Sequence, residues 1–177
     1  MAWSLLGRKT RGAEEAGRLL YGAVVAQARR PLFYTALRVP DTPNGRFELY
    51  SLHTILLLRG LKGRGGTASA ASQNLFDTYV SSLDDALREQ GVGDLSMAKK
   101  MRKLGEAFYG RVRSYDEAFE ALPDRGPLES LLNRTVCAEG GDAPALTAYT
   151  VRTLAELAGE SGVGLVEGRV QWPEIAA

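Results

Sequence analysis

Residues 38–58, RVPDTPNGRFELYSLHTILLL, join a proline-containing loop to the most apolar helix candidate of the chain. Pro40 and Pro43 each fix φ and bias the residue before them toward extended geometry. Asn44 and Gly45 form a turn dipeptide in which either residue can take a positive φ at little cost. The pattern therefore predicts a rigid loop that turns at these two residues and passes directly into a helix.

The helix predicted over residues 46–61 is apolar on nearly every face. Its apolar residues are Phe47, Leu49, Tyr50, Leu52, Ile55, Leu56, Leu57, Leu58 and Leu61. A helix with one apolar stripe packs one side against the core, whereas a helix that is apolar all round is covered by neighbours on several sides. We therefore expect this helix at the centre of the fold, with Leu52, Ile55 and Leu56 in the core.

Apolar periodicity, prolines and glycine-rich breaks divide the rest of the chain into further helices. Five of these helices are predicted over residues 13–28, 31–37, 71–90, 128–140 and 144–159. A further helix is predicted to begin after a cap at Asp94 or Ser96. Residues 161–177 form an irregular or extended tail, and no convincing strand pair occurs. The sequence thus predicts an all-α, single-domain bundle of six or seven helices over residues 13–177. Residues 1–12 are expected to be a basic N-terminal segment, either disordered or at a membrane surface.

The composition limits the possible classes of protein. The chain has 177 residues, of which 45% are hydrophobic, so it is long enough to bury a core. Its longest apolar run, residues 54–58, is far shorter than the ~20 residues of a membrane span. The single cysteine, Cys137, cannot form an internal disulfide, which favours a reducing compartment. The single histidine, His53, excludes a metal site built from several histidines.

Charge is distributed unevenly along the chain. Residues 1–67 carry 11 Lys and Arg against 4 Asp and Glu, and residues 68–177 carry 11 against 17. A folded bundle can interleave these charges so that they neutralise each other. Alternatively, the basic N-terminal third faces anionic lipid or RNA. Both interpretations stay open at this point.

Three blocks of sequence, in order and at plausible spacing, resemble the ubiquinol–cytochrome c chaperone family. They are residues 38–58, LFDTYV at 75–80, and GVGDL at 91–95 followed by Lys99, Lys100 and EAFYG at 106–110. The resemblance implies an assembly factor that binds cytochrome b or another subunit of respiratory complex III, without enzymatic activity or cofactor.

The resemblance has further implications for partners and location. We expect a bacterial, cytoplasmic member without a cleaved targeting segment. Such a protein could bind peripherally to the inner face of the cytoplasmic membrane. Members from eukaryotes associate with translating ribosomes, so the resemblance allows a ribosome contact. No DNA contact is expected.

Residues with catalytic potential are few. His53 could serve as a general base or an axial haem ligand, but a hydrogen-bonded core histidine fits its apolar neighbours better. Asp41 and Glu48 could form a carboxylate pair across the loop, although loop-organising and capping roles explain them as well. No catalytic triad order or metal-ligand spacing is present. We therefore expect no enzyme and no metal site.

Candidate client-binding residues follow from the loop and from the aromatic side chains. They are Asp41, Asn44, Arg46 and Tyr50 at the mouth of a groove, and Tyr79 and Tyr109 along an apolar groove that Phe76 and Phe108 could also line. The alternative is that Arg46 only pairs with Asp41 and that the aromatic residues, Tyr50 included, pack inside, as aromatic stripes at helical spacing usually do.

Two basic clusters are candidates for contact with anions. One is Trp3 with Arg8, Lys9 and Arg11, which could form a short membrane-interface anchor or a frayed terminus. The other is Lys99, Lys100 and Lys103 with Arg102, which could be a solvated helix face or a contact with membrane, RNA or the ribosome. Few aromatic residues are interleaved with these cations, which disfavours base stacking.

Overall fold

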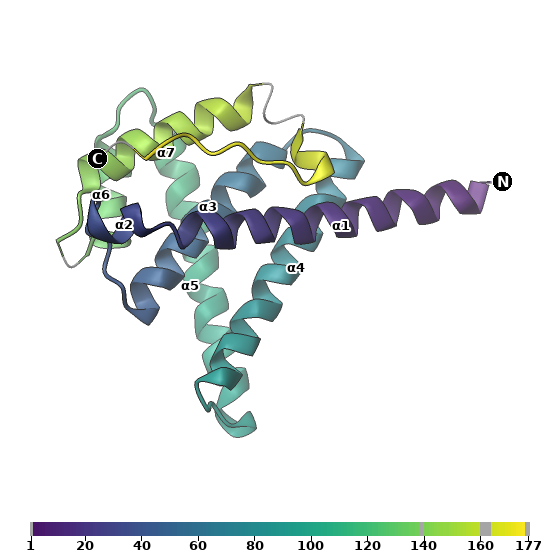
Figure 1. The fold of residues 1–177 in the computed structure, drawn as a ribbon, viewed down its shortest axis with the longest axis horizontal. Coiled ribbons are helices and arrows are strands. Elements are labelled where there is room, and N and C mark those ends of the chain that lie inside the picture. The colour runs from purple at the N-terminus through teal and green to yellow at the C-terminus, as the bar shows by residue number, and fades with distance from the viewer. Residues whose placement is uncertain (1, 139, 160–163, 176–177) are drawn as a thin grey trace.

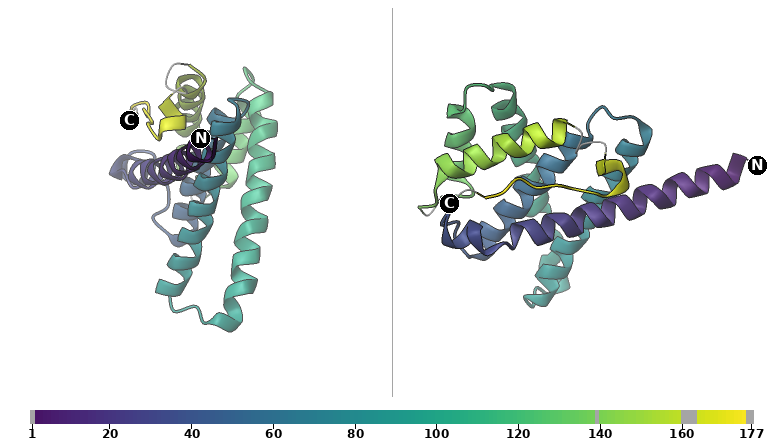
Figure 2. Two further views of the ribbon diagram at one scale, coloured as in Figure 1. Left: turned by 90° about the vertical axis from the view of Figure 1, so that its right-hand side faces the viewer. Right: turned by 45° about the horizontal axis from the view of Figure 1, so that its top comes forward.

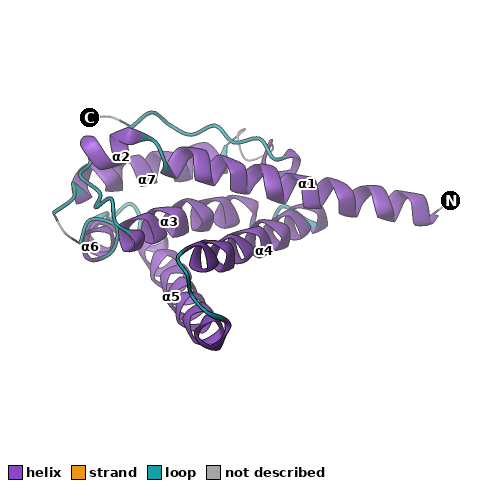
Figure 3. Cartoon of the chain, turned by 60° about the horizontal axis from the view of Figure 1, so that its bottom comes forward, coloured by secondary structure: helices purple, strands orange, loops and turns teal. Residues whose placement is uncertain are grey.

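The computed structural model describes residues 2–138, 140–159 and 164–175, with only the backbone described for residues 2–11. Its helices are α1 (Ala2–Ala28), α2 (Pro31–Thr35), α3 (Pro43–Leu61), α4 (Gly66–Glu89), α5 (Asp94–Glu120), α6 (Gly126–Arg134), α7 (Ala143–Ala158) and the short 3-10 helix η1 (Leu165–Glu167). No strand occurs in the residues that the structure describes (Figure 3). The predicted all-α, single-domain fold is confirmed.

Helix α3 lies at the centre of the bundle. It packs against α1, α4, α5 and α7, and α1 also runs along α4 (Figures 1 and 3). All side chains from residue 51 to residue 57 are buried, which confirms the prediction of a helix covered on several sides. Leu52, Ile55 and Leu56 are at most 2% exposed, so the predicted centre of the core is confirmed.

Helices α4 and α5 form a two-helix arm that projects from the bundle (Figures 1 and 2). The arm bends back at residues 90–93, where Gly91 has a φ of 77°, a left-handed conformation that glycine adopts without strain. The second half of α5 returns to the body and buries Tyr115, Ala118 and Phe119. The arm therefore has a root in the core and an exposed tip.

The start of α3 differs from the prediction because Thr42 caps it. The Thr42 side chain accepts a hydrogen bond from the Gly45 backbone N–H over 3.1 Å, and Pro43 occupies the first turn, where its missing N–H costs nothing. Asn44 and Gly45 are therefore helical, and the predicted turn at these residues is wrong. Glycine is still needed, since a Cβ at residue 45 would lie 2.1 Å from the Pro40 carbonyl oxygen.

Other helix starts also differ from the prediction, those of α6 and α7 by no more than two residues. Helix α1 begins at Ala2 instead of residue 13, and α4 begins at Gly66 instead of residue 71. Helix α5 has Gly93 as its N-cap and no side-chain cap. The predicted capping by Asp94 or Ser96 is wrong, because the Ser96 hydroxyl donates to the Gly93 carbonyl over 3.0 Å.

The C-terminal segment over residues 164–175 is a strap across the bundle (Figure 1). Gly168 lies against Leu19 of α1 with no room for a side chain, and Trp172 meets the ring of His53 edge-on, with centroids 5.1 Å apart. Apart from η1 the strap has no regular structure, as predicted for the tail; residues 161–163 and 176–177 lie outside the described residues. Among the described helices, none combines the length and apolarity that crossing a bilayer requires.

Candidate functional site

A pocket with charged and aromatic side chains in its lining lies where the end of α1, the short helix α2 and the start of α3 meet. Its volume is about 370 Å³, and it opens to solvent. It is lined by Arg29, Pro31, Tyr34, Thr35, Asp41, Arg46 and Tyr50. Three of the predicted client-binding residues, Asp41, Arg46 and Tyr50, therefore lie together in one site.

The local sequence explains how the pocket wall is built. Pro31 disfavours helical geometry in the residue before it, which ends α1, and then opens α2. Tyr34 donates a hydrogen bond from its hydroxyl to the Ala28 carbonyl over 2.8 Å, so α2 folds back on the end of α1. The Thr35 hydroxyl donates to the Pro31 carbonyl over 3.1 Å and closes this short helix. The wall is thus held by local hydrogen bonds.

Two arginines and one carboxylate set the charge of the pocket. Arg46 Nε donates to Asp41 Oδ1 over 2.6 Å, and this hydrogen bond lowers the pKa of the Asp41 carboxyl. Arg29 Nε donates to the Tyr50 hydroxyl over 2.8 Å and has no carboxylate partner among the described residues. The lining therefore carries one positive charge in excess at neutral pH. Since the Asp41–Arg46 pair is largely exposed, it adds little to stability.

Glu48 serves a different purpose from the one predicted. Its side chain is only 4% exposed, and its two oxygens accept hydrogen bonds from Arg111 Nε and Nη2 over 2.7 and 2.6 Å. This bidentate ion pair ties the first turn and a half of α3 to α5. Asp41 and Glu48 are each paired with a different arginine, so the suggested carboxylate pair between them does not form.

The predicted aromatic groove does not form as one surface. Tyr79 is 1% exposed, shares a hydrogen bond of 2.8 Å with the Ser51 hydroxyl, and has its pKa raised by burial. Tyr79 therefore belongs to the core, and its assignment to an exposed client surface is corrected. Phe108 is also buried, whereas Tyr109 is 62% exposed on the arm. Tyr109 is not among the residues that line the pocket. Asn44 is exposed in the first turn of α3 but does not line the pocket.

His53 is a core histidine, as predicted. Gln27 Nε2 donates to the Tyr149 hydroxyl over 3.0 Å, and that hydroxyl can donate in turn to His53 Nε2 over 2.9 Å. His53 Nδ1 lies 2.8 Å from the Leu49 carbonyl and can donate to it. A neutral ring thus satisfies both nitrogens, and burial lowers the pKa of His53 to about 4. No group of His, Cys, Asp and Glu suited to a metal ion occurs in the described part of the chain.

The two basic clusters differ in what the structure describes of them. The side chains of Trp3, Arg8, Lys9 and Arg11 lie outside the described residues. Lys99, Lys100 and Lys103 are exposed on the first half of α5, with Arg102 between them. None of these four α5 cations forms an ion pair with a described carboxylate.

Sequence reasoning missed four of the residues that line the pocket: Arg29, Pro31, Tyr34 and Thr35. The signal was present in RRPLFYT at residues 29–35, where two cations precede a helix-opening proline and a tyrosine follows. That stretch predicts the end of one helix and the start of a short one, and it carries no functional prediction. Its nearness to the loop at residues 39–42 arises from tertiary packing.

Comparisons with known proteins place this geometry in context. The family model described as "Ubiquinol-cytochrome C chaperone" matches residues 35–172, a range that includes Asp41, Arg46 and Tyr50. Among solved structures, the chain is similar to the crystal structure of the Cbp3 homolog from Brucella abortus, with 34% sequence identity and a TM-score of 0.87. That similarity covers 99% of this chain and 98% of the other. The comparison with curated proteins gave no match.

Proposed function

The chain belongs to the ubiquinol–cytochrome c chaperone family, and from this premise we propose that it is an assembly chaperone of respiratory complex III that binds newly made cytochrome b. It acts without catalysis: it holds the subunit and releases it when partner subunits dock. In a bacterial cell this work takes place at the inner face of the cytoplasmic membrane. The observation that carries the proposal is the pocket that brings Asp41, Arg46 and Tyr50 together within the family region.

The pocket suits a polar client segment that carries a carboxylate. Arg29 and Arg46 each use Nε for a bond inside the protein, and their terminal nitrogens have no hydrogen-bond partner among the described residues. These nitrogens can donate to a carboxylate or to backbone carbonyls in fork geometry. The single excess positive charge also favours an anionic group over a cationic one. Tyr34 and Tyr50 supply aromatic walls for the apolar part of the same segment.

The pocket is held in shape before a client arrives. Two prolines restrict the loop before α3, the Thr42 cap fixes the start of that helix, and Asp41 holds the Arg46 side chain. Ordering entropy that is lost in folding does not have to be lost again on binding. A rigid pocket can therefore bind a client with useful affinity even where the contact area is small.

The proposal is tested with the double variant Arg29→Ala and Arg46→Ala in a pulldown from solubilised membranes. We expect helix content to stay unchanged and recovery of cytochrome b to fall at least about tenfold, because each lost charged hydrogen bond contributes about 1.5–3 kcal/mol. The matched control is Arg18→Ala with Arg125→Ala, two exposed arginines on α1 and beside α6. Equal recovery with the pocket variant and with wild type would contradict the proposal.

A second variant, Asn44→Ala, defines the extent of the site. Asn44 is exposed beside the pocket but outside its lining. If the client extends along the first turn of α3, recovery falls for this variant as well. If the grip is limited to the pocket, recovery stays near that of wild type.

A further inference from the structure

The tip of the arm carries an isolated apolar side chain in full contact with solvent. Leu95, the second residue of α5, is 104% exposed, more than any other large apolar residue described as exposed. A single exposed leucine needs no functional explanation by itself. The residues near Leu95 on α5 nevertheless suggest a role for it, because several of them are exposed cations.

The outer face of α5 combines Leu95 with unpaired cations. Residues four and seven positions further along the helix, Lys99 and Arg102, lie on the same side as Leu95. Lys103 lies beside this stripe, Lys100 lies further round the helix on the same side as Lys103, and Tyr109 extends the stripe toward the body. All of these side chains are exposed, and none of the four cations has a described carboxylate partner. The only carboxylate on the stripe between Leu95 and Tyr109 is that of Glu106.

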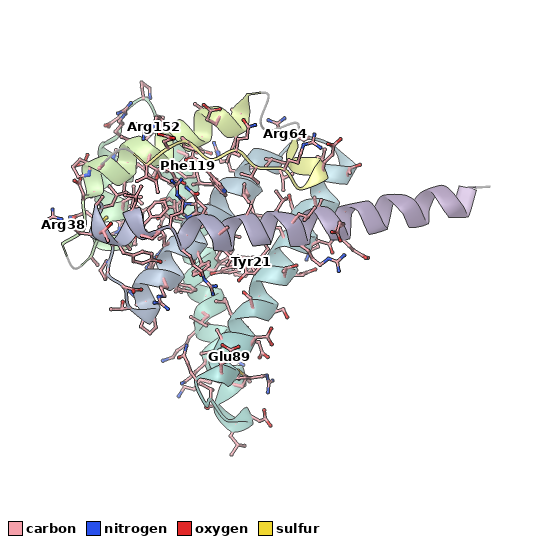
Figure 4. The ribbon with its side chains drawn as sticks, viewed as in Figure 1. Tyr21, Arg38, Arg64, Glu89, Phe119 and Arg152 are labelled. Atoms are coloured by element: carbon pink, nitrogen blue, oxygen red, sulfur yellow. The ribbon has the colours of Figure 1, made fainter. Side chains whose placement is uncertain are left out.

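Helix α4 carries most of the acidic residues of the arm. Asp84, Asp85 and Glu89 lie on α4, and Figure 4 shows Glu89 on the outer part of the arm. Arg88 donates to Asp84 over 2.7 Å and to Asp94 over 3.2 Å, so two of the carboxylates near the tip are already paired. The arm therefore has a cationic α5 face and an acidic α4 face. An anionic surface can be met favourably only by the first of these.

We propose that the α5 face of the arm, from Leu95 to Tyr109, docks on an anionic lipid bilayer. Leu95 enters the boundary of the acyl chains, the lysines and Arg102 contact the lipid headgroups, and the amphipathic ring of Tyr109 lies at the interface. Because the arm projects from the bundle (Figure 2), its α5 face can approach a flat surface without the body in between. This inference is independent of the pocket and of the client.

Lipid fits this face better than RNA does. Single-stranded nucleic acid is held by aromatic platforms on which successive bases stack, together with cations along the backbone. The face has one exposed aromatic ring, Tyr109, and its most exposed apolar group is an aliphatic side chain. An aliphatic tip surrounded by cations is the pattern of a shallow bilayer contact. One leucine and four cations predict weak, reversible and salt-sensitive binding.

The test measures cosedimentation of the full chain with phosphatidylcholine vesicles that contain about 30 mol% phosphatidylserine or none, since anionic lipid attracts basic segments. One variant is Lys99→Gln with Lys100→Gln and Lys103→Gln, and the other is Leu95→Ser. The charge-matched control is Arg18→Gln with Arg125→Gln and Arg134→Gln, three exposed cations away from the arm. We expect the triple lysine variant to bind at least about tenfold more weakly, Leu95→Ser about threefold more weakly, and the control to bind like wild type.

A second readout reports insertion directly. An environment-sensitive dye attached to Leu95→Cys should shift to the blue only on the phosphatidylserine vesicles; Cys137 is buried and does not compete for the label. The proposal is overturned if the dye does not shift, or if the arginine control loses as much binding as the lysine variant. It is also overturned if the chain binds single-stranded RNA more tightly than vesicles and Leu95→Ser leaves the binding of both unchanged, because the partner is then a nucleic acid.

Discussion

Helices α3 and α5 are both long, but their surroundings differ. Side chains on α3 from residue 51 to residue 57 are all buried, and the polar side chains of Ser51 and His53 have partners inside the core. On α5, most side chains before residue 108 are at least partly exposed, and the cations there have no described partner. Packing therefore constrains each position from residue 51 to residue 57 of α3, whereas the outer face of α5 is free to carry surface chemistry.

The largest expected effect compares two leucines, one from each helix. Leu56 is 0% exposed and Leu95 is 104% exposed. We expect Leu56→Ala to lower the free energy of unfolding by about 2–5 kcal/mol, because it removes buried methyl groups and leaves a cavity. Leu95→Ala should change that free energy by less than about 0.5 kcal/mol. Urea unfolding followed by circular dichroism measures both, and equal losses would contradict the contrast between the helices.

The next effect lies where the two helices are joined. Arg111→Ala leaves the carboxylate of Glu48 buried without its partner, and we expect a loss of about 2–3 kcal/mol in the free energy of unfolding. The loss should be smaller than for a fully buried pair, because the Arg111 side chain is 29% exposed. Arg113→Ala, an exposed arginine on the same helix, is the control. If both variants unfold alike, the ion pair does not link α3 to α5.

The stability of the protein should depend on pH through His53, a buried residue of α3. The pKa of His53 is lowered to about 4 in the folded protein, whereas it is about 6.5 in an unfolded chain. Between these values the unfolded state binds the extra proton, so His53 makes the protein less stable as the pH falls from about 6.5 to about 4. The full contribution is on the order of 3 kcal/mol at pH 4 and is absent above pH 7.

The His53→Gln variant isolates this contribution. Carboxylates also titrate in the lower part of the range, but they do so in both proteins. The difference in free energy of unfolding between wild type and His53→Gln should therefore change with pH between 4 and 6.5 and stay constant above 7. A constant difference at every pH would mean that the pKa of His53 is the same in the folded and unfolded states.

The smallest effect on stability is expected from the outer part of α1. The first residue described as buried on α1 is Ala13, and the helix projects beyond the body before it (Figure 2). Deleting residues 2–11 should change the midpoint of thermal unfolding by no more than about 2 °C. If Trp3, Arg8, Lys9 and Arg11 form an anchor, the same deletion lowers binding to vesicles with anionic lipid. Unchanged vesicle binding would rule that anchor out.

The sequence predicted the centre of the fold better than its edges. An all-round apolar helix has only one stable environment, so the core position of Leu52 and Leu56 followed from the pattern alone. Helix starts depend on single capping bonds, and the bond between Thr42 and Gly45 competes with a turn at Asn44–Gly45 that the same residues could equally form. The packing of the loop determines which of the two forms, and the local sequence alone does not predict that packing.

The candidate site shows the same limit. Tyr79 and Tyr109 occur in similar aromatic patterns, but Tyr79 faces Ser51 in the core and Tyr109 faces solvent. Whether each tyrosine is buried depends on which helices pack beside it in the folded chain, and the local sequence does not contain that information. Asp41, Arg46 and Tyr50 could be predicted as neighbours because one loop and one helix start carry them. Arg29 could not, because only the fold of α2 against the end of α1 brings it to Tyr50.

The strap over residues 164–175 joins parts of the core that lie far apart in the sequence. Trp172 covers one edge of His53, and Gly168 packs on Leu19, so two distant parts of the chain meet under one segment. Contacts of this range form late, because the long intervening loop loses entropy before any contact compensates it. Residues 164–175 follow α1, α3 and α7 in the chain, so the contacts of Trp172 with His53 and of Gly168 with Leu19 can form only after all three helices have been made.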